Sequence, residues 1–162
     1  MILQDRDVEI INYLEQNGGS IQQIGDLYFN GSYAAAKHRL RKLEQDKFIK
    51  GAKHPIINKK VYYRGKIPSY HKIIAQDIYI KNKEVIQEFK REAKLDKHIV
   101  DIFILTKKLN IYVIELDVFN KTTSKKIESV KKYIKTKLGK EARIIVFNKK
   151  DIDNESHLQR IS

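Results

Sequence analysis

The spacing of apolar residues constrains the first third of the chain most strongly, because three short segments carry them at helical intervals. The pattern predicts helices over about 5–16, 20–28 and 32–45, separated by glycine-containing turns. Strand-forming residues at 48–49 and 61–63 follow, and they predict a β-hairpin. The beginning of the chain is therefore expected to fold as three helices and a hairpin.

Local signals support the second and third helices. Ser20 and Gln23 have the spacing of a capping box at the start of the second helix. Ala36, Leu40 and Leu43 lie on one side of the third helix and are expected to face a core.

Positive charge is concentrated around the third helix and the hairpin. The 162-residue chain has a net charge of +13. Residues 1–31 hold one arginine against five acids, whereas residues 32–66 hold eleven lysines and arginines against two acids. Charge gathered into one block favours a surface that binds a polyanion over general solubility.

A basic third helix followed by a basic hairpin is typical of a winged helix-turn-helix domain, here over residues 1–66. In such a domain the third helix enters the major groove of double-stranded DNA, and the wing, here 48–64, lies along phosphates. The alternative is a small core with a solvated basic face, or a protein-interaction module. His54 is also expected on the DNA-facing surface. The predicted DNA-binding residues are Ser32, Tyr33, Lys37, His38, Arg41, Lys42, Lys53, Lys59, Lys60 and Arg64.

The rest of the chain predicts a second domain over residues 96–150. Its last strand is reached through a helical crossover and should lie parallel to a neighbour in a mixed sheet. The elements predicted after residue 66 are a connecting helix over 67–95, strands over 99–105 and 111–119, a helix over 123–138, a strand over 142–147 and a frayed polar tail over 151–162.

Three acids interrupt the apolar strands of this domain, where an unpaired buried carboxylate is costly. Alternation places Glu115 and Asp117 on one face of their strand, and Asp101 lies on the adjoining strand, so the three side chains are expected to converge. Converging carboxylates can bind Mg²⁺ and activate water for phosphodiester cleavage, with Asp101 and Glu115 as the metal ligands. The alternative is that these acids pair with neighbouring lysines, arginines or backbone groups.

The α-β-β-α-β order with this acid spacing resembles the PD-(D/E)xK nuclease core, which implies a restriction-endonuclease-like α+β or α/β domain. In this resemblance Asp101 stands at the metal-binding aspartate, and Glu115 to Asp117 stand at the (D/E)xK positions. Asp117 therefore replaces the lysine, and Lys125 or Lys126 on the following helix would have to substitute for it. Loss of that lysine removes a main charge-stabilising group, so a non-catalytic domain is favoured.

Taken over residues 5–147, the chain resembles the replication-relaxation family of plasmid proteins. The resemblance depends on the helix that begins near Tyr70-His71-Lys72, on the Glu115-x-Asp117 pair, and on Lys131-Lys132-Tyr133 in the following helix. It implies a plasmid-borne DNA-binding protein that acts in replication or in DNA relaxation and transfer. The E-x-D form is usual in that family, so Asp117 agrees with it.

Several classes of protein are excluded by composition and motifs. Without cysteine the chain has no disulfide, catalytic thiol or cysteine-bound zinc. It has no phosphate-binding glycine-rich loop, and no cofactor is expected except Mg²⁺ at an active nuclease site. It has neither a long apolar run nor the basic start of a signal peptide, which predicts a cytoplasmic protein that binds no membrane.

Three hypotheses follow. The first is a DNA-binding accessory protein of plasmid replication, relaxation or conjugative transfer, with duplex DNA and plasmid replication or relaxase proteins as partners. The second is a Mg²⁺-dependent endonuclease that uses Asp101, Glu115, Asp117 and Lys126. The third is a transcriptional repressor that binds DNA as a homodimer.

Overall fold

The computed structural model describes all 162 residues and shows a mixed α+β protein. The chain divides into two compact units, Met1–Ile80 (unit 1) and Lys81–Ser162 (unit 2). None of the helices has the length and apolar composition needed to cross a lipid bilayer.

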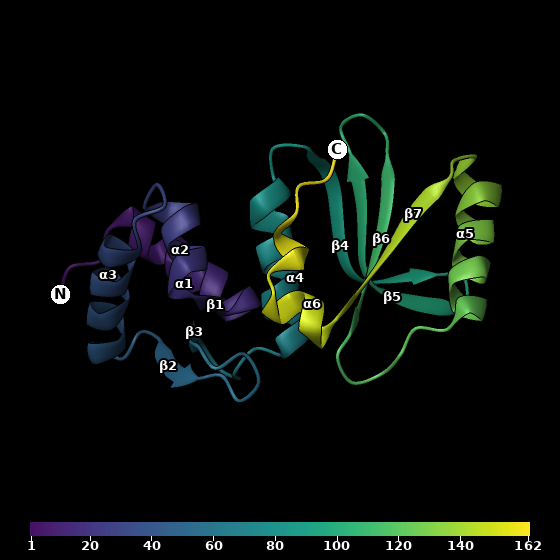
Figure 1. The fold of residues 1–162 in the computed structure, drawn as a ribbon. Helices are drawn as coiled ribbons and strands as arrows, with labels where there is room; N and C mark the ends of the chain where they lie inside the picture. Colours follow the sequence, from purple (N-terminus) through teal and green to yellow (C-terminus); the bar gives the residue numbers. More distant parts are fainter. The chain divides into compact units, whose positions relative to one another are not determined.

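Unit 1 contains three helices, a small sheet and most of a fourth helix (Figure 1). The sheet has the order β1-β3-β2 and is antiparallel throughout. The elements of unit 1 are α1 (Asp5–Asn17), β1 (Gly19–Ser20), α2 (Ile21–Tyr28), α3 (Tyr33–Gln45), β2 (Lys50–Lys53), β3 (Lys60–Tyr63) and the start of α4 (Tyr70–Asn82).

The three predicted helices are confirmed, and their ends have the expected capping. The Ser20 side chain accepts a hydrogen bond from the Gln23 backbone N–H (3.1 Å), and the Gln23 side chain accepts one from the Ser20 N–H (3.1 Å). The core-facing side of α3 is also confirmed, because Ala36, Leu40 and Leu43 are fully buried. They pack with residues of α1, α2 and β3 in one hydrophobic cluster.

The prediction of a connecting helix over 67–95 is wrong in its second half. The helix α4 ends at Asn82, and residues 86–95 form a strand, β4 (Ile86–Leu95). This strand is rich in Glu, Lys, Arg and Gln, which favour helices in isolation. It is a strand because it pairs along its length with the apolar strand β5, and such tertiary pairing overrides local propensity.

Unit 2 is a four-stranded mixed sheet in the order β4-β5-β6-β7. β4, β5 (His98–Thr106) and β6 (Ile111–Asp117) are antiparallel neighbours. The helix α5 (Ser124–Leu138) then leads to β7 (Ala142–Asn148), which pairs with β6 in parallel, as predicted. The added first strand makes the order α-β-β-β-α-β instead of the predicted α-β-β-α-β.

One face of this sheet is covered by α5. Val130 and Ile134 of the helix pack in a cluster with Val100 and Phe103 of β5 and with residues of the other three strands. Glu115 lies on the same face, because it follows Ile111 and Val113 of this cluster at alternate positions along β6.

The predicted frayed tail is wrong as well. Residues 149–158 contain α6 (Lys149–Asp153) and a 3₁₀ turn (Ser156–Leu158), with Ile152 and His157 buried. The Ser162 carbonyl accepts hydrogen bonds from Asn110 Nδ2 (3.0 Å) and Tyr112 Oη (3.1 Å). The apolar side of a short helix and these polar contacts hold a segment whose polar composition suggested disorder.

Candidate nucleic-acid interface and carboxylate cluster

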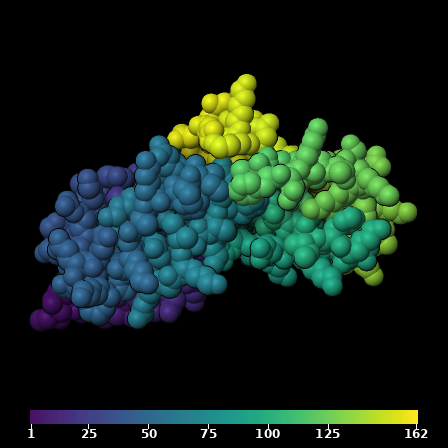
Figure 2. All heavy atoms as spheres, turned by 90° about the horizontal axis from the view of Figure 1, so that it is seen from below, coloured from purple at the N-terminus to yellow at the C-terminus, as the bar shows by residue number.

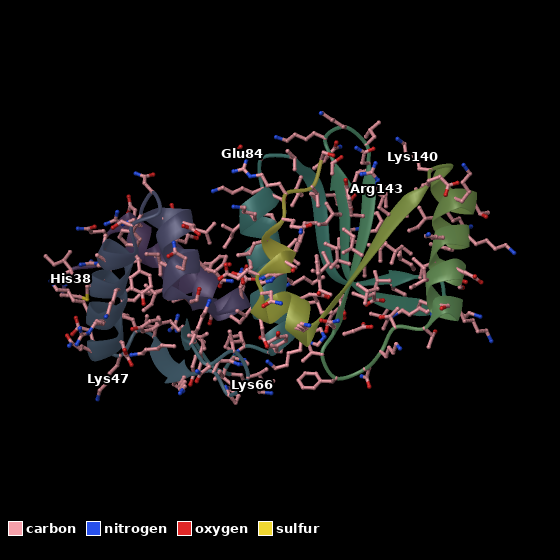
Figure 3. The ribbon with its side chains drawn as sticks, in the orientation of Figure 1. His38, Lys47, Lys66, Glu84, Lys140 and Arg143 are labelled. Atoms are coloured by element: carbon pink, nitrogen blue, oxygen red, sulfur yellow. The ribbon has the colours of Figure 1, made fainter.

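All ten predicted DNA-binding residues have exposed side chains on α3, on its N-cap, on the hairpin β2–β3 or, for Arg64, directly after β3. Ser32 is the N-cap of α3 and accepts a hydrogen bond from the Ala35 N–H at 3.2 Å. Along the helix Lys37 and Arg41 lie one turn apart, on the side opposite the buried leucines. His38 projects from the outer side of α3 (Figure 3).

An arginine that was not singled out from the sequence fixes α3 against α1. Arg39 donates from Nε to Oδ1 of the fully buried Asp7 at 2.6 Å, and from Nη2 to Oδ2. Asp7 also accepts from the Gln4 backbone N–H at 2.7 Å. The hydrogen bonds from Arg39 hold the pKa of Asp7 below its ordinary value, against the effect of burial. Arg39 therefore serves the fold, while the side chains of Lys37, Arg41 and Lys42 face solvent.

The hairpin presents a further set of cations. Lys53 and Lys59 are exposed and form no ion pair. Lys60 is exposed too, but its ammonium pairs with Glu44 of α3 at 3.0 Å and lies 4.9 Å from the centre of the Tyr62 ring. This pair links the hairpin to α3, so Lys60 has a structural partner in addition to its place on the surface.

The expectation that His54 faces DNA is wrong, because its side chain is buried. Its Nδ1 accepts a hydrogen bond from the Ile56 N–H at 3.1 Å, and its Nε2 lies 3.0 Å from the Pro68 carbonyl oxygen. A backbone N–H can only donate and a carbonyl can only accept, so this geometry fits the imidazole tautomer with its proton on Nε2. His54 joins the hairpin turn to the segment before α4.

Basic residues missed in the sequence extend the same surface. Lys47, Lys50 and Lys66 are exposed and lie at the end of α3, at the start of β2 and after β3. In Figure 2 the blue residues of α3 and the hairpin make up most of the visible face of unit 1. All three belong to the basic block over residues 32–66, but charge counting alone gives no reason to single them out from the other cations of that block.

In unit 2 two of the three predicted acids converge with a lysine. The Asp101 carboxylate accepts from the Leu116 N–H at 2.7 Å, and the Glu115 carboxylate accepts from the Asp101 N–H at 3.2 Å. Lys126 of α5 brings its ammonium to 2.6 Å from Glu115 Oε1 and donates to the Ile99 carbonyl at 2.9 Å. The carboxylates thus bind backbone N–H groups of neighbouring strands.

Glu115 is the buried member of this cluster, with only 4% of the residue exposed. Burial raises the pKa of its carboxyl above the ordinary value, Asp101 raises it further, and Lys126 opposes both. The ion pair therefore compensates the cost of burying the charge only in part.

Asp117 does not join Asp101 and Glu115, so the predicted convergence of three carboxylates is wrong. Its oxygens accept from the Thr122 backbone N–H (2.6 Å) and from the Thr122 hydroxyl (2.5 Å). The reason is local: Asp117 ends β6 and closes the loop that leads to α5. No group of three acidic or histidine side chains in the chain is close enough to hold a metal ion.

A nuclease site would need carboxylate oxygens of Asp101 and Glu115 that are free to bind Mg²⁺. Oε1 of Glu115 faces an ammonium and Oε2 accepts from a backbone N–H, while Oδ2 of Asp101 accepts from another. A divalent cation prefers several oxygen ligands with no competing cation among them. As arranged, these residues do not fit a magnesium site.

Comparison with known proteins gives few similarities. No protein-family model matches the chain, and no curated protein does. Similar solved structures include a repair endonuclease from Pyrococcus abyssi, with 25% identity over 60% of this chain, 49% of that chain and a TM-score of 0.36. They also include a complex of EndoMS with double-stranded DNA, with 17% identity over 64% of this chain, 50% of that chain and a TM-score of 0.31.

The match spans about half the length of each of these two chains. Their TM-scores are too low to establish a common fold, so a function for this chain has to be argued from its own residues.

Proposed function

We propose that unit 1 is a winged helix that binds double-stranded DNA, with α3 in the major groove and the hairpin β2–β3 as the wing. The single observation that carries this proposal is the exposure of all ten predicted contact residues on α3, at its N-cap and on or directly after the adjoining hairpin. Supporting it are the element order α1-β1-α2-α3-β2-β3 and the sheet order β1-β3-β2.

The fixed position of α3 supports the same role. A helix that reads base edges must be held rigidly, so that its exposed side chains reach the groove in one register. The bidentate Arg39–Asp7 contact and the buried leucines hold the inner side of α3 against the core of unit 1, and the Lys60–Glu44 pair connects α3 to the hairpin. The cations left for DNA on α3 are then Lys37, Arg41 and Lys42.

The test is the affinity of the purified full chain for a fluorescent DNA duplex, measured across a range of salt concentrations. Each lysine or arginine that contacts a phosphate adds about one unit to the slope of log K against log salt. Lys37→Ala/Arg41→Ala should weaken binding and lower this slope by about two. Unchanged affinity and slope would remove α3 from the interface and reject the proposal.

For the biological role, the resemblance to the replication-relaxation family suggests an accessory protein of plasmid replication, relaxation or conjugative transfer. In this proposal unit 2 has no catalytic activity, and the Asp101–Glu115–Lys126 cluster connects β5, β6 and α5. Replication or transfer genes beside the coding sequence would support the role, whereas a neighbourhood of metabolic genes would favour a repressor.

The second candidate, a metal-dependent nuclease, would require the Lys126 ammonium to leave Glu115 before a metal ion could bind there. This lysine comes from the helix after β6 and reaches Glu115, so a lysine does stand beside two acids although Asp117 occupies the motif position. Incubation of supercoiled DNA with the full chain and Mg²⁺ or Mn²⁺ separates the two candidates. Cleavage that is lost in both Asp101→Ala and Glu115→Ala would reject the non-catalytic proposal, and absence of cleavage at every metal concentration would reject the nuclease.

A further inference from the structure

Unit 2 carries more net positive charge than unit 1. Residues 81–162 hold twenty lysines and arginines against twelve acids, a net charge of +8, whereas residues 1–80 have a net charge of +5. The segment 121–140 alone holds eight lysines and one acid, Glu128. This segment has a net charge of +7, so the rest of unit 2 is close to neutral. The excess positive charge of unit 2 therefore lies on α5 and on the residues at both ends of that helix.

These lysines lie mainly on one side of the helix. Val130 and Ile134 are buried against the sheet, and Lys126 reaches Glu115 on that sheet. The positions that a helical period places opposite them are exposed, and in Figure 1 this side of α5 faces away from the sheet of unit 2. They are occupied by Lys125, Glu128, Lys131, Lys132 and Lys135.

The structure gives these cations little internal compensation. Lys125, Lys131 and Lys132 form no ion pair, and Lys135 reaches Glu141 at 3.3 Å in a pair whose two side chains are both mostly exposed. Exposed pairs of this kind contribute little. Lys131 and Lys135 also repel each other across one helical turn, and an acid at either position would remove that repulsion. A surface built only for solubility has no need of this pattern, since acids serve solubility better.

We infer that the exposed face of α5 binds the phosphate backbone of double-stranded DNA, as a second contact that is independent of base sequence. Lysine ammonium groups bind phosphates as point charges, and the exposed hydroxyls of Ser124 and Thr136 add hydrogen-bond donors. The helix face has no exposed aromatic ring on which an unpaired base would stack, because Tyr133 is half-buried, and this favours a duplex over a single strand.

The inference takes its partner from the proposed function of unit 1, but its evidence comes from other residues. It predicts that one chain contacts DNA phosphates through both units. The affinity of the full chain then depends on salt more steeply than the cations of unit 1 alone allow.

The test uses the full chain with the substitutions Lys131→Ala, Lys132→Ala and Lys135→Ala combined. Alanine is the best helix former, so α5 should persist, which circular dichroism can verify. The matched control removes three exposed lysines of unit 2 that lie outside α5, by Lys83→Ala, Lys94→Ala and Lys150→Ala. A third variant keeps the charge, by Lys131→Arg, Lys132→Arg and Lys135→Arg.

We expect the α5 alanine variant to lower the salt slope by about three and to raise the Kd at about 0.1 M salt at least tenfold. The control and the arginine variant should keep the wild-type slope to within about one unit. Equal losses in the α5 variant and in the control would mean a general effect of net charge, and would overturn the inference. Tighter binding to a single strand than to the duplex of the same sequence would also overturn it.

The two proposals can fail separately. A loss of slope in the α5 variant with no effect of Lys37→Ala/Arg41→Ala would reject the function proposed for unit 1 and keep the α5 contact. A loss of slope in the unit 1 variant with no effect of the α5 variant would reject the α5 contact and keep the function proposed for unit 1.

Discussion

Single residues divide into those whose role follows from local pattern and those whose role depends on a partner far along the chain. The buried side of α3 follows from helical spacing, and so does the exposure of Lys37 and Arg41. The roles of Arg39 and His54 do not, because each depends on a group brought close only by the tertiary fold. A basic or imidazole side chain in a basic block carries no local sign of whether it faces solvent or a buried partner.

The Arg39–Asp7 contact gives a prediction for stability. Arg39→Ala leaves Asp7 buried without its cation and should lower the free energy of unfolding by about 3 kcal/mol at neutral pH. Arg41→Ala, on the exposed side of the same helix, is the control and should change it by less than about 0.5 kcal/mol. Denaturant unfolding measures both, and equal effects of the two substitutions would contradict this account of α3.

The same contact predicts a dependence on acid. The folded state holds the pKa of Asp7 below its ordinary value of 3.8, mainly through the hydrogen bonds from Arg39. The stabilisation is therefore present above that value and is lost as the pH falls through the pKa of the folded state. Stability curves of wild type and Arg39→Ala should converge in acid, and a constant difference between pH 7 and pH 3 would contradict the linkage.

Glu115 should show the opposite pH dependence. Burial raises its pKa above the ordinary value of 4.5, so the folded state binds this proton more tightly than the unfolded chain does. Its contribution to stability is complete below about pH 4.5 and is lost as the pH rises through the pKa of the folded state. Glu115→Gln should therefore gain stability relative to wild type between pH 4 and pH 7, whereas Lys126→Ala should lose it. Thermal unfolding at the two pH values checks both, and a relative loss for Glu115→Gln at pH 7 would contradict it.

Helices were predictable where one side is apolar and the ends carry capping or turn residues, as in α1, α2, α3 and α5. The strands β5, β6 and β7 were predictable from their short apolar runs, and the parallel pairing of β7 follows from its crossover. The strand β4 was not predictable, because its residues favour a helix and only pairing with β5 makes it a strand. The predicted site in unit 2 failed in part for a related reason: alternation gave the face of Asp117 but not the loop that its carboxylate closes.

The glycine that ends α1 gives a prediction about how neighbouring elements pack. Gly18 has a φ of 65°, and a Cβ built there would lie 2.7 Å from Pro68 Cβ. Gly18→Ala combines left-handed backbone strain with this overlap, so it should lower the free energy of unfolding by about 2–3 kcal/mol. Gly65 has a φ of 86° with no atom within 4 Å of such a Cβ, so Gly65→Ala should cost only the backbone part, about 1 kcal/mol. Equal losses in denaturant unfolding would mean that the contact with Pro68 is unimportant.

The whole molecule consists of two compact units, and each of them presents a basic helix. The charge of unit 1 lies on α3 and the hairpin, and that of unit 2 lies on α5. The basic block at 32–66 identified the first surface from the sequence. The second surface is less evident in the sequence, because the lysines of α5 alternate with the apolar residues that pack on the sheet.

The central claim is that unit 1 binds duplex DNA through α3 and the hairpin, and mapping the contact surface tests it most directly. Backbone amide shifts of the isotopically labelled full chain would be followed by NMR while a short duplex is added. The account predicts the largest shifts in residues 32–45 and 50–64, with a second set in α5 and little change along the buried side of α1. Shifts confined to other surfaces would contradict the claim. An absence of shifts in a large excess of duplex would contradict it as well.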